Sequence, residues 1–215
     1  GWPQAAGAST DAAMDIAAAY VDGVCDSDVS RIDGVRRDPE KIRALLTSLA
    51  RNESTLSSPK AIGADTDGKV SKSTLMRYMD ALRRVNVVDD IPAWYPALRS
   101  PVRLRQAPKR HLSDPSLAAS LLGADPASLI SDPKTLGLLF ESLVLHDLKV
   151  YAAASGARLS HYHDGNDLEV DGIVHSRDGA WVAVEVKLGA SQVPDAVDSL
   201  MRLEQIMVSH GDRPP

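Results

Sequence analysis

Three β-strand patterns enclosed by two amphipathic helix patterns are the feature that most constrains how this chain can fold. The turn formers Asp-Gly-Asn and Arg-Asp-Gly separate the predicted strands, which is typical of hairpins. Apolar residues at three- and four-residue spacing predict the helices. We therefore expect an α+β fold with the order helix, three strands, helix. The strands are predicted at residues 158–163, 167–175 and 180–188, and the helices at 134–151 and 193–209.

Glu141 lies on the apolar face of the first of these helices. Leucines at positions 138, 145 and 148 share that face, so the carboxylate is expected to point toward the interior. A buried carboxylate needs a cation, a metal or a proton as its partner. The sequence therefore predicts an internal polar site beside the sheet.

Glu185 and Lys187 project from one face of the last predicted strand, because side chains two residues apart point the same way. One antiparallel register of the preceding strand brings Asp171 beside Glu185. Paired carboxylates suit a hard cation such as Mg²⁺ or Mn²⁺, and a lysine nearby can position water or stabilise developing charge during phosphodiester hydrolysis. In this hypothesis Asp171 and Glu185 are metal ligands and Lys187 is the catalytic ammonium. The alternative is a structural ion pair between buried Glu185 and Lys187, beside an exposed Asp171.

The set Glu141, Asp171 and Glu185-Val186-Lys187 resembles the PD-(D/E)XK, restriction-endonuclease-like superfamily. The surrounding segments are similar to the C-terminal domain of unknown function that follows the ATPase core in a family of prokaryotic AAA-type ATPases. The resemblance implies a mixed sheet flanked by helices over residues 99–215 and a catalytic role for all four of these charged side chains. The segments are Gly-Leu-Leu-Phe-Glu-Ser-Leu-Val from residue 137, Leu-Glu-Val-Asp-Gly-Ile-Val from residue 168 and Val-Glu-Val-Lys-Leu-Gly from residue 184, with Pro-Lys-Arg-His-Leu-Ser-Asp-Pro-Ser-Leu-Ala from residue 108 ahead of them.

The first half of the chain is predicted to be helical, with helices at residues 11–24, 39–52 and 58–65 and a further helix capped by Ser71. β-Branched residues over 85–91 predict a small strand or wing after the last helix. We interpret residues 40–95 as a winged helix-turn-helix, in which Lys72 and Arg77 are candidate nucleic-acid contacts. The alternative is a structural three-helix module that touches no DNA. The last helix buries Leu75, Tyr78, Met79 and Leu82, and the helix at 11–24 buries Met14, Ile16, Ala17 and Tyr20.

The family resemblance extends to this half and implies a helical lid over residues 1–55 and a winged helix over 56–98. Gly-Trp-Pro at residues 1–3 is similar to the motif that closes the family's ATPase module. The phosphate-binding motif Gly-x-x-x-x-Gly-Lys-(Ser/Thr) is not present, because Gly68-Lys69 is followed by Val70. We expect a fragment of such a protein, without ATPase activity of its own.

A basic belt lies between the two halves, where residues 99–111 hold five basic and no acidic side chains. Residues 112–215 hold seven basic and 15 acidic side chains, and prolines cluster near the belt, so we expect a domain junction at 92–110. Two interpretations are open: the belt contacts phosphates of a nucleic acid, or it is a strap that pairs with acids of the second half. Its members are Arg99, Arg103, Arg105, Lys109 and Arg110.

Composition limits the functional classes. The net charge of −5 argues against a chain that simply coats nucleic acid. With one cysteine, no leader and no run of about 18 apolar residues, we expect a soluble cytoplasmic chain without a membrane partner. Two hypotheses follow, namely a Mg²⁺- or Mn²⁺-dependent nuclease-like domain that binds DNA, and a non-catalytic regulatory or protein-interaction module of the ATPase.

Overall fold

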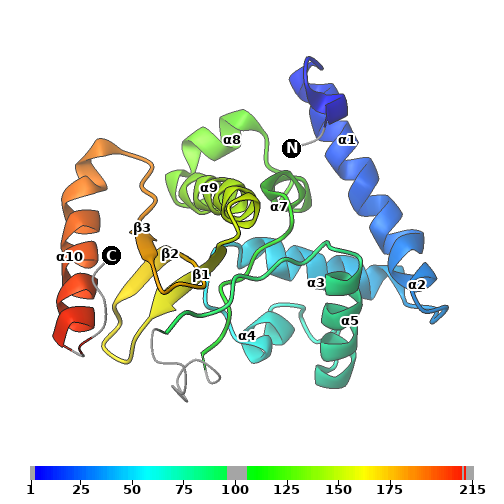
Figure 1. The fold of residues 1–215 in the computed structure, drawn as a ribbon. Coiled ribbons are helices and arrows are strands. Elements are labelled where there is room, and N and C mark those ends of the chain that lie inside the picture. The colour runs from blue at the N-terminus through cyan, green and yellow to red at the C-terminus, as the bar shows by residue number, and fades with distance from the viewer. Residues whose placement is uncertain (1–2, 96–105, 210, 212–215) are drawn as a thin grey trace. The chain divides into compact units, whose positions relative to one another are not determined.

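The structure is a computed structural model of the chain, and it describes residues 3–95, 106–209 and 211 (Figure 1). The chain divides into two compact units, each made of two separate segments. The first unit contains Gly1–Asp90 and Arg110–Leu139, and the second contains Ile91–Lys109 and Phe140–Pro215. Helices dominate the described residues and accompany one small antiparallel sheet, so the α+β prediction is confirmed.

Helices build the first unit. A 3₁₀ turn at Pro3–Ala5 precedes α1, and a π-helical turn at Val24–Asp28 joins α1 to α2. The remaining helices follow in chain order, and α9 begins in the first unit and continues into the second. The bounds are α1 (Thr10–Gly23), α2 (Val29–Arg31), α3 (Pro39–Arg51), α4 (Pro59–Ala64), α5 (Lys72–Arg84), α7 (Pro115–Leu121), α8 (Pro126–Ser131) and α9 (Pro133–Ala154).

Side-chain caps begin several of these helices where the sequence predicts them. The carboxylate of Asp38 accepts a hydrogen bond from the N–H of Glu40 at the start of α3, and Ser71 caps α5 through the N–H of Thr74. Each cap satisfies a backbone donor that has no partner within the helix. The predictions for α3 and α4 are confirmed to within one residue at each end, and α5 begins directly after the predicted cap Ser71.

The core of the first unit differs from the prediction at α1. The predicted stripe on α5 is confirmed, because all four of its apolar side chains are buried. In α1, however, Ala17 and Val21 are the buried residues, whereas Met14 is exposed. The helix continues through the π-helical turn, and its inward face is therefore extended by Val24 and Cys25.

The segment after α5 does not form the predicted strand. Val88 instead makes an isolated bridge with Leu112, a residue far away in the sequence. Residues 85–91 therefore take their pairing from residues 109–113, at the end of the basic belt and directly after it, and no hairpin wing forms within them. Lys72 and Arg77, the candidate nucleic-acid contacts, are exposed on α5.

The second unit contains a sheet of order β1-β2-β3, in which both neighbouring pairs are antiparallel. The predictions for β1 and α10 are confirmed at both ends, whereas β3 stops four residues before its predicted end. Trp94, Trp181 and Tyr162 pack together with Leu203 and Met207 of α10, which lies against β2. The bounds are β1 (Arg158–His163), β2 (Glu169–His175), β3 (Trp181–Val184) and α10 (Val193–Ser209), with a 3₁₀ turn at Ala190–Gln192.

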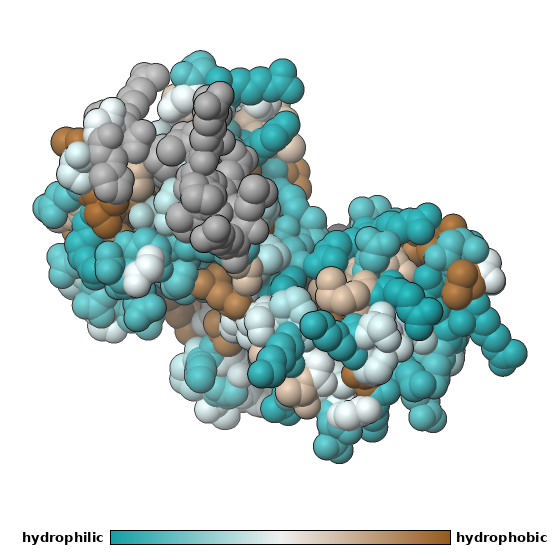
Figure 2. All heavy atoms as spheres, turned by 90° about the horizontal axis from the view of Figure 1, so that it is seen from below, coloured by the Kyte–Doolittle hydropathy of each residue, from teal (hydrophilic) through white to brown (hydrophobic). Residues whose placement is uncertain are grey.

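The surface is mainly hydrophilic on the face that Figure 2 shows, where hydrophobic residues form small, separate patches. Among the residues that the structure describes, no helix is both long enough and apolar enough to span a lipid bilayer.

Candidate functional site

Backbone pairing with Ile91 holds Lys109 beside the sheet of the second unit. Its N–H and its carbonyl form two hydrogen bonds with Ile91, each 2.9 Å long. The segment that follows Ile91 runs along β1, where the N–H of Trp94 donates to the carbonyl of His161 at 2.7 Å. These bonds fix the position from which the Lys109 side chain extends.

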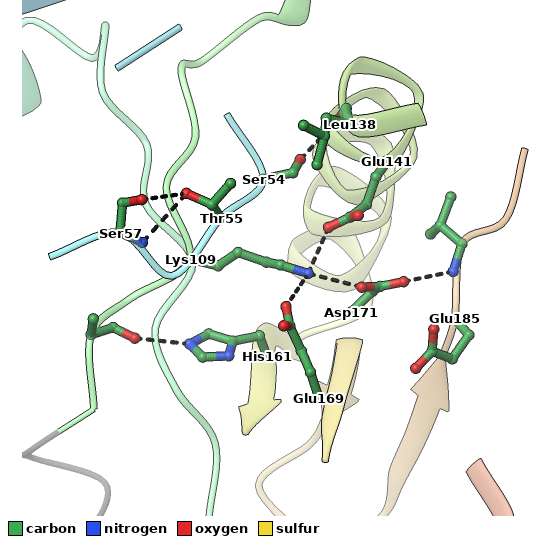
Figure 3. Close-up of polar contacts among 12 residues, drawn as sticks. Ser54, Thr55, Ser57, Lys109, Leu138, Glu141, His161, Glu169, Asp171 and Glu185 are labelled. Atoms are coloured by element: carbon green, nitrogen blue, oxygen red, sulfur yellow. Dashed lines mark hydrogen bonds and ion pairs between the residues drawn. The ribbon is translucent and has the colours of Figure 1, made fainter. Parts of the chain in front are cut away.

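The Lys109 ammonium contacts three carboxylates (Figure 3). Its Nζ lies 2.6 Å from Oε1 of Glu141 on α9, and 2.9 Å from Oε1 of Glu169 and 2.8 Å from Oδ1 of Asp171, both on β2. The Lys109 side chain is 1% exposed, whereas that of Glu169 is 39% exposed, so the site reaches solvent on the Glu169 side. We call Glu141, Glu169 and Asp171 the acidic cluster.

Close packing of α9 on β2 brings Glu141 into this cluster. Leu145, one turn after Glu141, is fully buried, and it faces Gly172 of β2. A Cβ atom on Gly172 would lie only 3.0 Å from Cδ2 of Leu145. Because glycine lacks that atom, α9 can approach β2 right beside Asp171. The prediction that Glu141 points inward is confirmed.

The register of β2 and β3 places Asp171 opposite residue 185, as predicted. Gly172 pairs with Val184 at the end of the ladder, so Asp171 and Glu185 are the residues that come directly after that pair on the two chains. The second carboxylate oxygen of Asp171, Oδ2, accepts a hydrogen bond from the N–H of Val186 at 2.9 Å. This side-chain bond occupies a backbone donor beyond Val184, the residue at which β3 ends.

Glu185 and Lys187 form an ion pair. Nζ of Lys187 lies 2.5 Å from Oε2 of Glu185 and 3.6 Å from Oδ2 of Asp171. The Glu185 side chain is 5% exposed and that of Asp171 is 10% exposed. The ion pair of the structural alternative is therefore present, but the expectation that Asp171 would be exposed is wrong, because Lys109 lets its carboxylate be buried without losing its charge.

Opposite charges keep Lys109 and Asp171 ionised. Burial alone would lower the pKa of Lys109, but the three carboxylates outweigh that effect and raise it above its ordinary value. Burial would raise the pKa of Asp171, but the charge and the hydrogen bond of Lys109 hold it below its ordinary value. Both groups therefore remain charged throughout the neutral pH range.

Glu185 behaves differently from Asp171. Burial and the neighbouring charge of Asp171 raise the pKa of Glu185 to about 7, although Lys187 acts in the opposite direction. Burial would lower the pKa of Lys187, but Glu185 and Asp171 together raise it. Glu185 is therefore the carboxylate of this site whose charge changes near neutral pH.

The donor set does not fit a divalent cation while Lys109 is in place. No group of three or more His, Cys, Asp or Glu side chains within the described ranges is arranged to hold a metal ion. The ammonium already stands among the oxygens of the acidic cluster, and a metal there would bring two positive centres together. The assignment of Asp171 and Glu185 as Mg²⁺ or Mn²⁺ ligands stays a prediction, and it requires Lys109 to move.

The basic belt has two members within the described residues, and both are buried. Lys109 pairs with the acidic cluster of the second unit. Arg110 belongs to the first unit, where its Nη1 lies 2.6 Å from Oδ2 of Asp90 and its Nε donates to the carbonyl of Ser57 at 2.9 Å. The contacts of Lys109 fit the strap interpretation, whereas Arg110 pairs with Asp90 of the first half and matches neither predicted role. Arg99, Arg103 and Arg105 lie outside the described residues.

Sequence reasoning missed that Lys109 and Glu169 belong to the site. The sequence contained a signal for Lys109, because a buried Glu141 needs a cation and the basic belt contains five basic side chains. The pattern did not show which cation reaches the helix, since 62 residues separate Lys109 from Asp171. The signal for Glu169 was its spacing, because it lies two residues before Asp171 on the same strand and strand alternation places both side chains on one face.

Comparisons with known proteins found two domain families. Residues 1–128, more than half of the chain, match the domain of unknown function DUF8612, and residues 136–213 match the domain of unknown function DUF4143. Uncharacterized proteins of Mycobacterium tuberculosis and Mycobacterium bovis are each 28% identical to the chain over 152 residues. The match covers 71% of this chain and 33% of each relative, so the chain spans about a third of their length.

No solved structure matches the chain significantly. Lys109 falls within the first matched region, whereas all three residues of the acidic cluster fall within the second. The site therefore combines residues from both matched regions. By the extent of its match, the chain belongs to the DUF8612 family, and it carries a segment similar to DUF4143.

Proposed function

We propose that this chain is the C-terminal part of an AAA-type ATPase family protein, and that its second unit is a nuclease-like module without catalytic activity. In this role the unit regulates the ATPase or provides its contacts with a partner. The single observation that carries the absence of catalysis is the state of Asp171. Oδ1 of Asp171 accepts a hydrogen bond from Lys109 at 2.8 Å, and Oδ2 accepts one from the N–H of Val186 at 2.9 Å. Both oxygens are therefore already occupied by contacts within the folded chain.

The link to an ATPase rests on sequence. The motifs around Glu141, Asp171 and Glu185 resemble the domain that follows an ATPase core, and DUF4143 is found in AAA-ATPase-associated proteins. The curated relatives are about three times as long as the matched segment, which leaves room for an ATPase module in them. Residues 1–55 then correspond to the lid of such a protein, and residues 56–98 correspond to the helical region that follows the lid, without the hairpin wing.

A metal-dependent nuclease is the second candidate. The observation in its favour is that Asp171, Glu185 and Lys187 lie together, because the β2–β3 register and two ion pairs connect them. In this candidate Asp171 and Glu185 hold Mg²⁺ or Mn²⁺, Lys187 assists the attacking water, and Lys72 and Arg77 of α5 contact DNA. It requires the Lys109 ammonium to leave the acidic cluster first.

A cleavage assay separates the two candidates. Supercoiled, linear and single-stranded DNA are incubated with the chain in Mg²⁺, Mn²⁺ or EDTA, beside Asp171→Asn and Lys187→Met, with folding checked by circular dichroism. We expect no metal-dependent cleavage by the folded wild-type chain. Cleavage that needs metal and disappears in both variants would replace this proposal with the nuclease.

The regulatory role needs a separate measurement. The rate of ATP hydrolysis is measured for a full-length relative and for the same protein truncated before the equivalent of residue 140. The control is the full-length protein with the equivalent of Lys134→Met, a substitution at an exposed position. A change in the ATPase rate on truncation, with none in the control, supports regulation. An unchanged rate together with unchanged partner binding would contradict it.

A further inference from the structure

We infer that Lys109 is a built-in substitute for a divalent cation, and that removing its ammonium turns the acidic cluster into a binding site for an external one. The inference concerns what neutralises Glu141, Glu169 and Asp171. It does not depend on whether the unit is catalytic.

The carboxylate oxygens of the acidic cluster are arranged around one point. Three carboxylate oxygens from α9 and β2 lie 2.6, 2.9 and 2.8 Å from a single nitrogen atom. Mg²⁺ binds carboxylate oxygens at about 2.1 Å and Ca²⁺ at about 2.4 Å, so each oxygen would move by less than about 1 Å to hold an ion instead. The cluster is thus arranged for an ammonium but is close to the arrangement that a hard cation needs.

The Lys109 ammonium suits the carboxylates that surround it. An ammonium has three N–H donors and no acceptor, and three carboxylates lie within 2.9 Å of Nζ of Lys109, which donates a hydrogen bond to Asp171. Its side chain is 1% exposed, so water does not compete for these donors. Lys109 therefore occupies the centre of the cluster fully, and no further cation is needed at that point.

The acidic cluster carries more negative charge than the Lys109 ammonium neutralises. Three carboxylates surround one ammonium, and the nearby Glu185–Lys187 ion pair adds no net charge when both groups are ionised. The remaining negative charge is what a divalent cation would neutralise better than an ammonium. Without Lys109 the three carboxylates would repel one another, and binding a divalent ion would relieve that repulsion.

The test measures Mn²⁺ binding by electron paramagnetic resonance and by isothermal titration calorimetry, which do not depend on enzyme activity. The whole chain is compared with Lys109→Met, which keeps the length of the side chain but removes its charge. Lys134→Met, at an exposed position of α9, is the matched control for loss of one positive charge. Lys109→Met combined with Asp171→Asn tests whether the acidic cluster holds the ion.

We expect Lys109→Met to bind one Mn²⁺ ion at least about tenfold more tightly than either the wild-type chain or the control, and the double variant to lose this gain. Equal binding by the wild-type chain and Lys109→Met would overturn the inference, and so would a folded Lys109→Met that binds no Mn²⁺. If Lys109→Met does not fold, the neutral donor Lys109→Gln is used, and both variants are refolded with Mn²⁺ or with EDTA. Recovery of structure only with Mn²⁺ supports the inference, and no recovery in either variant overturns it.

These outcomes remain separate from those of the cleavage assay. A Lys109→Met variant that binds Mn²⁺ but leaves DNA intact supports both the inference and the non-catalytic role. Metal-dependent cleavage by the wild-type chain contradicts the non-catalytic role, and Mn²⁺ binding by the wild-type chain as tight as by Lys109→Met contradicts the inference.

Discussion

Lys109 neutralises carboxylates that would otherwise be costly to bury. Glu141 and Asp171 are 13% and 10% exposed, and their charges are compatible with that burial because one ammonium serves both. Removing one partner of a buried ion pair leaves the other charge without compensation. This costs more stability than replacing both partners with apolar residues. The stability of the second unit should therefore respond strongly to Lys109.

The first prediction follows from that imbalance. In EDTA, Lys109→Met should lower the free energy of unfolding by about 3–5 kcal/mol, because the acidic cluster loses its cation. Lys72→Met, at an exposed position of α5, should change it by less than about 0.5 kcal/mol. Urea unfolding followed by circular dichroism measures both. Equal effects of the two substitutions would show that the Lys109 contacts contribute nothing to stability.

The second prediction concerns pH. The folded chain raises the pKa of Glu185 to about 7, so this group favours the folded state below its ordinary pKa and loses that contribution as the pH rises through 7. Stability should fall between pH 5 and pH 8, and Glu185→Gln should flatten that decrease. Thermal unfolding of both proteins across this range tests the prediction. A parallel decrease in the variant would assign the pH dependence to another group.

At the scale of elements, the contact between α9 and β2 depends on the missing side chain of Gly172. Leu145 of α9 lies where a Cβ on that residue would come within 3.0 Å, and Leu159 of β1 would lie 3.4 Å away. The position is inside the sheet and packed from two directions. A small side chain there has to push the helix outward, and the helix carries Glu141.

Gly172→Ala should therefore destabilise the unit by about 1–3 kcal/mol, the usual cost of adding a methyl group to a packed core. Leu145→Ala in the same chain should recover part of that loss relative to the sum of the two single effects, because the two side chains compete for one space. A double-mutant cycle in urea measures the coupling. Additive effects would show that Leu145 is not what excludes the methyl group.

Local signals predicted most elements. Caps and turn residues predicted α3, β1, α10 and the start of α5 to within one residue, because those signals act over a few neighbouring positions. The end of β3 was not predictable, since a side chain of β2 takes the N–H of Val186 and no alternation pattern records that competition. The missing wing has a similar cause, because Val88 finds its partner in Leu112.

The candidate site was predictable only in part, for the same physical reason. Helical spacing predicted that Glu141 points inward, and strand alternation predicted that Asp171 lies beside Glu185. The third component, Lys109, comes from a segment whose backbone is positioned by Ile91 and β1 rather than by its own sequence pattern. Contacts between distant segments depend on the whole fold, so a periodic pattern cannot reveal them.

At the scale of the whole molecule, the compact units and the matched families divide the chain differently. The second unit includes Ile91–Lys109, whereas the DUF4143 match begins at residue 136. A segment chosen by the family match alone therefore contains the acidic cluster but not its cation. The domain boundary at residue 99 stays a prediction, and the compact units do not follow it, because Arg110–Leu139 belongs to the first unit.

This difference leads to a prediction about fragments. A fragment of residues 133–215 should be at least about 3 kcal/mol less stable than one of residues 91–215, because it lacks both Lys109 and the segment that pairs with β1. Its stability should also rise with salt, since salt screens the repulsion among the carboxylates. Urea unfolding at two salt concentrations measures both effects. Equal stability of the fragments would show that the second unit does not need Ile91–Lys109.

The separation of 62 residues between Lys109 and Asp171 also has a consequence for how the chain folds. Contacts between distant segments form late, because closing the intervening loop costs entropy before the contact exists. Lys109→Gln should therefore accelerate unfolding much more than it slows folding, and stopped-flow kinetics would detect the reverse. During synthesis Lys109 leaves the ribosome before Glu141, Glu169 and Asp171, so the cation is already present when the acids emerge. We therefore expect the three carboxylates to come together in the same late step in which Lys109 reaches them, because only then is their repulsion compensated.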